Sequence, residues 1–289
     1  MAYKGKRINP QKFERGQIKI ILLVLPLVLF MAMPLIFIAN HAFKPMEELF
    51  AFPPTFFVRN ATMENFTKLL KFSRTAGIPL GRYVFNSAAV TVLTVGLSLF
   101  FTTCAAFALA KIKFKGRSML MQINQIAIMF VAVAVLIPRY LVICQLQMID
   151  TIWAHVLPLV AMPVALFLVK QFVEQVPDSL IEAAYMDGAT DFMVYRKVIL
   201  PMISPAIATA AILVFQQVWT NLETSNYYMN DDSIKTLTFY MNSLVNANNT
   251  VSGQGISAAA TLIMFLPNLI LFIVLQKNVM NTMAHSGIK

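Results

Sequence analysis

The chain has 289 residues, of which 58% are hydrophobic and only 12% are charged, and its formal net charge is +10. A soluble domain carries about a quarter charged residues, so this composition excludes a soluble globule and predicts a protein whose main solvent is lipid. The positive charges lie beside hydrophobic segments and not in a basic stripe interleaved with aromatic residues, so nucleic acid is not an expected partner.

The N-terminal residues 1–19 carry six Lys or Arg side chains against one acid, Glu14, which predicts a cytoplasmic segment under the positive-inside rule. A first membrane span is predicted at about residues 20–39. This apolar run is longer than the roughly 7–15 residues typical of a signal peptide, so we expect a retained helix. Residues 40–82 contain several charges and prolines and are predicted to form a long loop outside the membrane.

The remaining five spans follow from further apolar runs, which lie at about residues 83–110, 119–138, 152–169, 202–218 and 256–275. Four basic residues separate the second span from the third, so that short loop is predicted to be cytoplasmic. Six crossings place both termini on the cytoplasmic side, together with the polar segment 172–201 and the tail 277–289. The prediction is an all-α membrane protein with one six-helix transmembrane domain, residues 20–276.

The polar segment between the fourth and fifth spans is predicted to form two short helices joined by a hinge. Ser179 and Glu182 have the spacing of a capping box, in which each side chain satisfies a free backbone N–H at the start of a helix. Gly188 is placed to end the first helix in a left-handed conformation, and Pro201 to stop the second. On geometry alone, an ordinary helical hairpin is an equal alternative to a functional loop.

Eight positions of this segment form a specific string, which consists of Glu182, Ala183, Ala184, Asp187, Gly188, Ala189, Leu200 and Pro201. The string resembles the EAA loop of ABC importer permeases. The resemblance implies the type I ABC importer permease fold. It also implies that these eight residues belong to a coupling helix that docks into a cleft on a cytoplasmic ATPase.

Further segments narrow the resemblance, namely Phe85-Asn86-Ser87, the run Ala105–Ala110, Phe114-Lys115-Gly116-Arg117 and Ile137-Pro138-Arg139-Tyr140. They are similar to carbohydrate importers of the maltose type. The C-terminal tail is similar to that of the smaller maltose-importer permease, which implies that Thr282, His285 and Gly287 contact the ATPases. Two departures are that Met-Ala-His-Ser stands where small tail residues are usual, and that Thr220 is inserted into the usual Trp-Asn pair.

Polar residues near the outer end of the fifth span are candidates for the substrate path, together with one in the sixth span. They are Gln216, Gln217, Trp219, Asn221 and Asn268. An aromatic ring beside amides suits a sugar, whose apolar ring faces stack and whose hydroxyls need donors and acceptors. The alternative is that Trp219 anchors the helix at the interface and the amides bond neighbouring helices.

The sequence contains no phosphate-binding Gly-rich loop with Lys and Ser/Thr, and no pairing of a nucleophile with a base. We therefore expect a transport subunit with no catalytic residue and no cofactor of its own, while partner subunits bind ATP and Mg²⁺. The three histidines, His41, His155 and His285, have no metal-site spacing, so no metal is expected.

The resemblance implies a sugar or oligosaccharide importer of the bacterial or archaeal cytoplasmic membrane, in which this chain forms half of the pore. The implied partners are a second, related permease, two ATPase subunits or domains, an extracytoplasmic substrate-binding protein and membrane lipid. An ABC permease for a polyol phosphate or another small solute is the alternative within the family. An ion-coupled carrier is disfavoured, because the spans lack charged residues near their centres and the chain shows no internal repeat.

Overall fold

The computed structural model describes residues 15–75, 77–247 and 253–286. These ranges are largely helical and contain no β-strand, which confirms the all-α prediction for them. Three helices are long and apolar enough to cross a membrane alone: α1 (Arg15–Phe43), α4 (Leu80–Lys111) and α15 (Gln254–Ser286). Three bent helix pairs pass the same test together, so up to six crossings are available by length and composition.

The other α-helices form the bent pairs and the elements between the crossings. They are α2 (Met46–Leu49), α3 (Glu64–Thr75), α5 (Arg117–Met129), α6 (Leu136–Gln145), α7 (Ile152–Val160), α8 (Pro163–Gln175), α9 (Asp178–Met186), α10 (Asp191–Val194), α11 (Leu200–Met202), α12 (Ser204–Trp219), α13 (Glu223–Tyr228) and α14 (Leu237–Ala247). Two 3₁₀ turns, Ala132–Val135 and Asp232–Ile234, and a π-helical turn, Tyr195–Ile199, lie between them. The segment 40–82, predicted to be an outer loop, therefore contains two helices, α2 and α3.

The predicted third span, 119–138, is not a single straight helix. Helix α5 ends at Met129 and the chain bends by 107° before α6, so no single helix covers the range. Pro138 does not end a helix, because it lies in the first turn of α6. Proline fits there, since the backbone N–H groups of a first helical turn have no partner within the helix.

The predicted fourth span, 152–169, is also divided. Helix α7 ends at Val160, and Pro163 starts α8 after a bend of 46°. Met162 precedes this proline and is extended, because the proline ring disfavours a helical conformation for the residue before it. The second, fifth and sixth predicted spans coincide closely with α4, α12 and the first two-thirds of α15.

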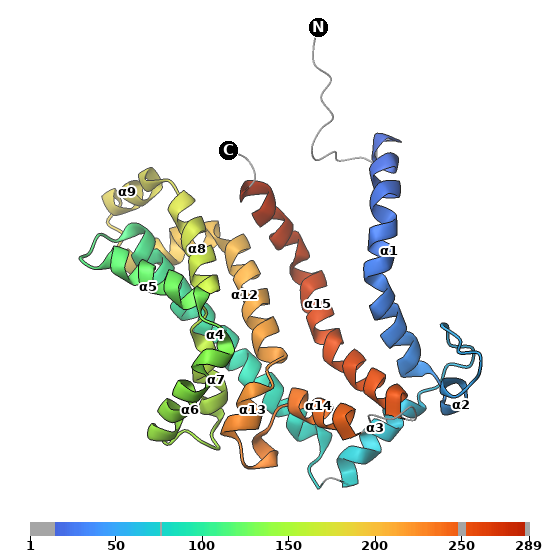
Figure 1. Ribbon diagram of the computed structural model, residues 1–289. Helices are drawn as coiled ribbons and strands as arrows, with labels where there is room; N and C mark the ends of the chain where they lie inside the picture. The colour runs from blue at the N-terminus through green and yellow to red at the C-terminus, as the bar shows by residue number, and fades with distance from the viewer. Residues whose placement is uncertain (1–14, 76, 248–252, 287–289) are drawn as a thin grey trace.

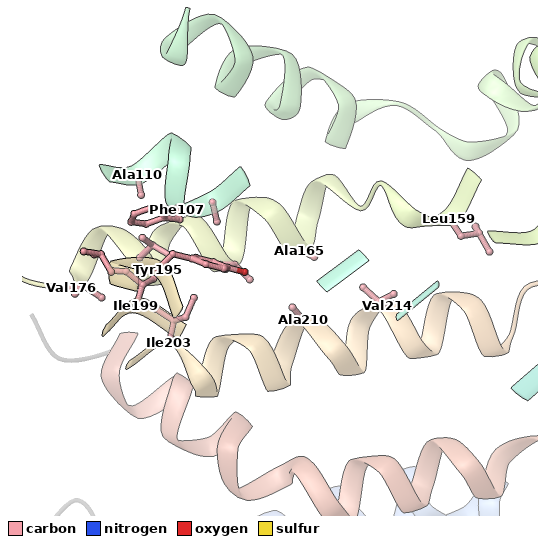
Figure 2. Packing of buried hydrophobic residues seen from close by; sticks show 14 of the residues in the cluster. Phe107, Ala110, Leu159, Ala165, Val176, Tyr195, Ile199, Ile203, Ala210 and Val214 are labelled. Atoms are coloured by element: carbon pink, nitrogen blue, oxygen red, sulfur yellow. The ribbon is translucent and has the colours of Figure 1, made fainter. Parts of the chain in front are cut away.

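Helix α4 is the centre of the larger hydrophobic core, with α8 and α12 packed against it (Figure 2). Ala106, Ala165 and Ala210 are fully buried in this core, and such small residues let membrane helices approach closely. Helix α1 is the opposite case. None of its most apolar 18-residue window is buried, against 39% for α4. Other parts of this chain therefore shield α4 and leave the surface of α1 uncovered.

The start of α1, the end of α15 and helix α9 lie toward one end of the molecule, and α3, α6, α13 and α14 lie toward the other (Figure 1). An even number of crossings between the two ends of the chain produces this arrangement. The polar segment that contains α9 therefore shares an end with the basic loop 112–116, which joins α4 to α5.

A second, smaller core joins the end of α1 to α3, α14 and α15. At its edge the Asn65 side chain donates hydrogen bonds from Nδ2 to the carbonyl oxygens of Ala42, at 3.0 Å, and Lys44, at 2.9 Å. Gly255 leaves room for this amide, because a Cβ atom at that position would lie 2.7 Å from Asn65 Nδ2 and Oδ1. The close approach of α15 to α3 thus depends on a glycine.

Replacing Gly255 with alanine is expected to lower the free energy of unfolding by about 1–3 kcal/mol, because the added methyl group displaces the Asn65 amide from its two carbonyl partners. Thermal denaturation of the purified protein in detergent measures the loss. Gly96→Ala is the matched control, since that helical position has no atom within 4 Å of an added Cβ. Equal stability of the two variants would contradict the prediction.

Candidate functional site

The polar segment folds as a hairpin over residues 177–203, hereafter the 177–203 hairpin. It consists of α9, a turn through Gly188, α10, the π-helical turn and α11, and it connects α8 to α12. In Figure 1, α9 lies at the edge of the molecule beyond the ends of α5 and α8.

The start of α9 contradicts the predicted capping box. The helix begins at Asp178, so Ser179 lies inside it, and the preceding Pro177 makes no side-chain capping bond. A residue from another helix holds this end instead. The Lys111 Nζ atom donates to the Val176 carbonyl oxygen at 2.6 Å and to the Asp178 Oδ1 atom at 2.7 Å. This ammonium group lowers the pKa of the Asp178 carboxyl below its ordinary value.

Lys111 belongs to a group of charged residues that joins four helix ends. Its side chain is only 10% exposed at the end of α4. Nearby, Glu174 of α8 accepts from Lys170 at 2.6 Å and lies 3.8 Å from the Arg117 guanidinium of α5. Arg117 also donates to the Ala110 carbonyl oxygen at 3.0 Å. The base of the hairpin is therefore fixed to α4 by a charge-assisted bond, beside ion pairs that connect α5 with α8.

The end of α9 confirms the prediction for Gly188. This glycine has a φ angle of +81°, which L side chains rarely adopt. Its N–H donates to the Tyr185 carbonyl oxygen at 2.9 Å, and the Ala189 N–H donates to the Ala184 carbonyl oxygen at 3.0 Å. These two bonds form a Schellman motif, which satisfies carbonyl groups at the helix end and reverses the chain.

Pro201 does not stop the second helix, contrary to the prediction. Helical structure continues to Met202, and the chain bends by 80° only at Ile203, before α12 begins. A wide π-helical turn precedes the proline. In this turn the Leu200 N–H donates to the carbonyl oxygen of Tyr195, five residues earlier. Pro201 lies in the last turn of this continuous helix, directly after the π-helical turn.

The inner face of the hairpin is built into the main core (Figure 2). Ile181, Val194, Ile199 and Ile203 are buried there, next to Phe107 and Ala110 of α4. Tyr195 is anchored by its hydroxyl, which lies 2.8 Å from Thr103 Oγ1, and its ring centroid is 5.7 Å from that of Phe107. The hairpin therefore moves with α4, because apolar packing and a buried hydrogen bond connect the two.

The outer face of the hairpin is exposed and mixed in character. Of the eight matching residues, Glu182, Ala183, Asp187, Gly188 and Pro201 are exposed, whereas Ala184, Ala189 and Leu200 are half-buried against the core. Large apolar side chains are exposed beside them, including Met186 at 88% and Phe192 at 64%. Such an apolar patch outside the spans is typical of a protein–protein contact surface.

The candidate substrate-path residues are only partly brought together. Trp219 donates from Nε1 to the Met264 carbonyl oxygen of α15 at 3.0 Å, and the Asn268 amide donates to the same oxygen at 3.4 Å. Asn221 instead accepts bonds from the Thr224 N–H and hydroxyl, while Gln216 and Gln217 are exposed. The bonds of Trp219 favour the helix-packing alternative for that residue. Among the described residues, the buried Asn268 Oδ1 has no hydrogen-bond partner.

The tail residues lie largely beyond what the structure describes. Helix α15 continues to Ser286, so Thr282 and His285 are part of a helical backbone, but their side chains are outside the described parts. Gly287 lies outside the described residues altogether. The contact of these three residues with an ATPase stays a prediction.

The anchoring residues Lys111, Thr103 and Tyr195 were not predicted as part of the site. Lys111 is 67 residues from Asp178 in the chain, and Thr103 is 92 residues from Tyr195. Lys111 looks like one more member of a basic loop in the sequence, and Thr103 like one of several helix-packing threonines. Only the packing of α4 against the hairpin distinguishes them.

Residues 77–279 match the protein family described as "Binding-protein-dependent transport system inner membrane component". The chain belongs to this family. It is thus a multi-pass inner-membrane permease, and its three long helices and three bent pairs agree with that class.

Several bacterial ABC-transporter permeases are similar to this permease over nearly its whole length. The probable permease YurM of Bacillus subtilis (strain 168) is 26% identical over 285 residues, which cover 96% of this chain and 91% of YurM. The arabinooligosaccharides permease AraQ of the same organism is 26% identical over 98% of this chain and 99% of its own. The diacetylchitobiose permease DasC of Streptomyces coelicolor is 28% identical, with 92% and 95% covered.

A solved structure shares the fold of this permease. A chain from the crystal structure of a bacterial ABC transporter, one that imports the acidic polysaccharide alginate, has a TM-score of 0.77 and 22% sequence identity. The match covers 93% of this chain and 99% of that chain. This likeness confirms the type I ABC importer permease fold.

Proposed function

We propose that this permease forms one half of the membrane pore of an ATP-driven sugar or oligosaccharide importer, and that the 177–203 hairpin docks on a separate ATPase subunit. The observation that carries the proposal is the two-sided character of the hairpin. Its inner face is fixed to α4 through Tyr195 and Lys111, while its outer face presents Glu182 and an apolar patch. A force applied to the outer face therefore reaches the pore helices.

The charge distribution supports a cytoplasmic position for the hairpin and for both termini. The loop that joins α4 to α5, with Lys113 and Lys115, lies at the hairpin's end of the molecule, and basic loops are retained in the cytoplasm. ATP is found on that side. Glu182 makes no hydrogen bond or ion pair with the described residues, so its carboxylate is available to a partner.

Partner subunits complete the proposed transporter. They are a second, related permease, two ATPase subunits or domains that hold ATP and Mg²⁺, and a substrate-binding protein outside the membrane. A second alginate-transporter structure with the same fold, at a TM-score of 0.60, contains a periplasmic protein bound to an alginate pentasaccharide. Helices α1 and α15 leave most of their apolar surface unburied, which supports a larger assembly in lipid.

A sugar substrate is supported by the names of the relatives, two of which transport arabinooligosaccharides and diacetylchitobiose. We expect the sugar to be uncharged. Lys170 and Arg139 are already paired with Glu174 and Glu223, at 2.6 Å and 2.7 Å, so neither cation is free to balance an anion. An acidic oligosaccharide is the second candidate, since the structure with the higher TM-score belongs to an alginate importer.

The test is purification of this permease with its bound subunits, followed by ATPase measurement in lipid. We expect a second permease and ATPase subunits to co-purify, and substrate-loaded binding protein to stimulate hydrolysis, with neutral oligosaccharides more effective than anionic ones.

Glu182→Lys should abolish the stimulation or the binding of the ATPase. Glu47→Lys is the control. Glu47 is also an exposed acid, and it lies in α2, at the opposite end of the molecule from the hairpin. Full activity of Glu182→Lys would refute the docking surface.

A further inference from the structure

The loop that follows α2, residues 50–58 and hereafter the 50–58 loop, exposes aromatic rings. Phe52 is 96% exposed, Phe57 67% and Phe50 59%. Phe56 is also exposed, at 39%. A loop in water usually turns polar side chains outward, so four exposed phenylalanines in nine residues require another environment. In Figure 1 this loop lies beside α2 at the end of α1, at the margin of the molecule and away from the core around α4.

The 50–58 loop runs back along α1 toward the membrane interior. The Phe56 ring centroid lies 6.0 Å from that of Phe37, and the Val58 N–H donates to the Asn40 Oδ1 atom at 3.1 Å. Phe37 is six residues before Phe43, where α1 ends. At 1.5 Å per residue the loop therefore reaches about 9 Å back from the end of the span.

Several polar groups in and beside the loop are paired with residues of α1 and α2. One carboxylate, Glu48, accepts from the Arg59 N–H at 3.0 Å and from the Asn60 N–H at 2.7 Å. The Thr62 N–H donates to the Phe43 carbonyl oxygen at 2.8 Å, and the buried Lys44 side chain donates to the Thr55 carbonyl oxygen. Backbone groups next to hydrocarbon need such partners, because no water is there to replace them. The Thr55 carbonyl oxygen and the Val58 N–H thus point toward α1, while the phenylalanine rings are exposed.

We propose that the 50–58 loop is a wedge inserted into the headgroup and acyl boundary of the lipid leaflet around the end of α1. Its exposed rings are continuous with the lipid-facing surface of α1, where Leu35 and Phe37 are 45% and 44% exposed. Aromatic rings are favoured at this depth of a bilayer. The inserted rings hold α1 at a fixed depth in the bilayer while the core helices move. The proposal requires only that α1 spans the membrane. That the leaflet is the outer one rests on the proposed function.

Site-directed spin labelling of the complete transporter in lipid nanodiscs tests the wedge. Nitroxides are attached to Phe52→Cys and Phe57→Cys in a background free of other cysteines, with Cys104 and Cys144 of this chain replaced by alanine. Arg59→Cys is the control, because Arg59 is exposed on the same segment beyond the last exposed ring. Phe52 is almost fully exposed, and the ring contact of Phe57 is with Phe56 of the same loop, so the substitutions leave the helix packing intact and the complex should assemble.

At Phe52 and Phe57 we expect collisions with oxygen, which concentrates in lipid, to exceed those with a water-soluble nickel chelate. The oxygen-to-nickel ratio should be severalfold higher there than at Arg59. A ratio equal to that of Arg59 would show that the rings face water. Slow collisions with both reagents would show that a protein subunit covers them. Either result overturns the wedge and leaves the co-purification and ATPase test of the proposed function unchanged.

Discussion

Replacing Gly188 with proline is expected to abolish substrate-stimulated ATP hydrolysis while the membrane helices still insert. Proline fixes φ near −65°, whereas Gly188 has a φ angle of +81°, so the turn after α9 cannot form. The variant also loses the N–H that donates to the Tyr185 carbonyl oxygen. The left-handed strain and the lost bond together amount to about 2–4 kcal/mol, enough to displace α9 from its docking position. ATPase activity of the purified complex, with and without loaded binding protein, measures the loss.

A graded series at the same position separates backbone conformation from crowding. No atom lies within 4 Å of a Cβ added at Gly188, so a small side chain meets no neighbour there. Asparagine tolerates the left-handed region better than alanine does. Coupling should therefore fall in the order glycine, asparagine, alanine, proline. If the proline variant were stimulated normally, or if asparagine were worse than proline, the turn would have no part in coupling.

Replacing Lys111 with methionine is expected to weaken coupling and to lower the stability of the hairpin. The methionine retains the aliphatic stem but leaves the buried Val176 carbonyl oxygen without its 2.6 Å donor, and it removes the partner of Asp178. An unsatisfied buried acceptor costs about 1–3 kcal/mol. The base of α9 would then separate from α4, so substrate-stimulated hydrolysis should fall severalfold. Thermal denaturation and the stimulation ratio of the complex are the two measurements.

Two variants control for charge and for the individual bonds of Lys111. Lys113→Met removes the same charge two residues later, from an exposed side chain, and should leave coupling nearly normal. Asp178→Asn should have a smaller effect than Lys111→Met, because the bond to the Val176 carbonyl oxygen remains and Asp178 is 76% exposed. Equal effects of Lys111→Met and Lys113→Met would mean that only the local positive charge matters.

Features set by local residues were predictable, and features set by distant ones were not. Apolar runs located α4 and α12 within a few residues and fell inside α1 and α15, because hydropathy alone decides which segments enter lipid. Gly188 was also predicted correctly, since a left-handed helix end needs a particular residue type. The capping box failed because Lys111, far along the chain, holds the start of α9, which lies at Asp178, two residues before the start that a Ser179 cap requires.

The breaks within the spans were missed for a related reason. A run of apolar residues such as 119–138 has the hydropathy of one helix whether it is straight or bent at Phe130. Pro201 was a misleading stop signal, because helical structure continues to Met202 and the bend falls at Ile203. For the candidate site, the exposed residues were predicted from the string. Their anchors, Thr103 and Lys111, required the packing of α4.

If the hairpin docks on an ATPase as proposed, the 80° bend at Ile203 lets α10 and α11 act as the short arm of a lever whose long arm is α12. A sideways push on the short arm would then tilt α12 about the fully buried Ile203. The 16 residues of α12 extend about 24 Å, so a tilt of only about 10° displaces the far end by about 4 Å. At that far end, Trp219 is hydrogen-bonded to α15 through Met264, so the displacement would pass from one crossing to the next.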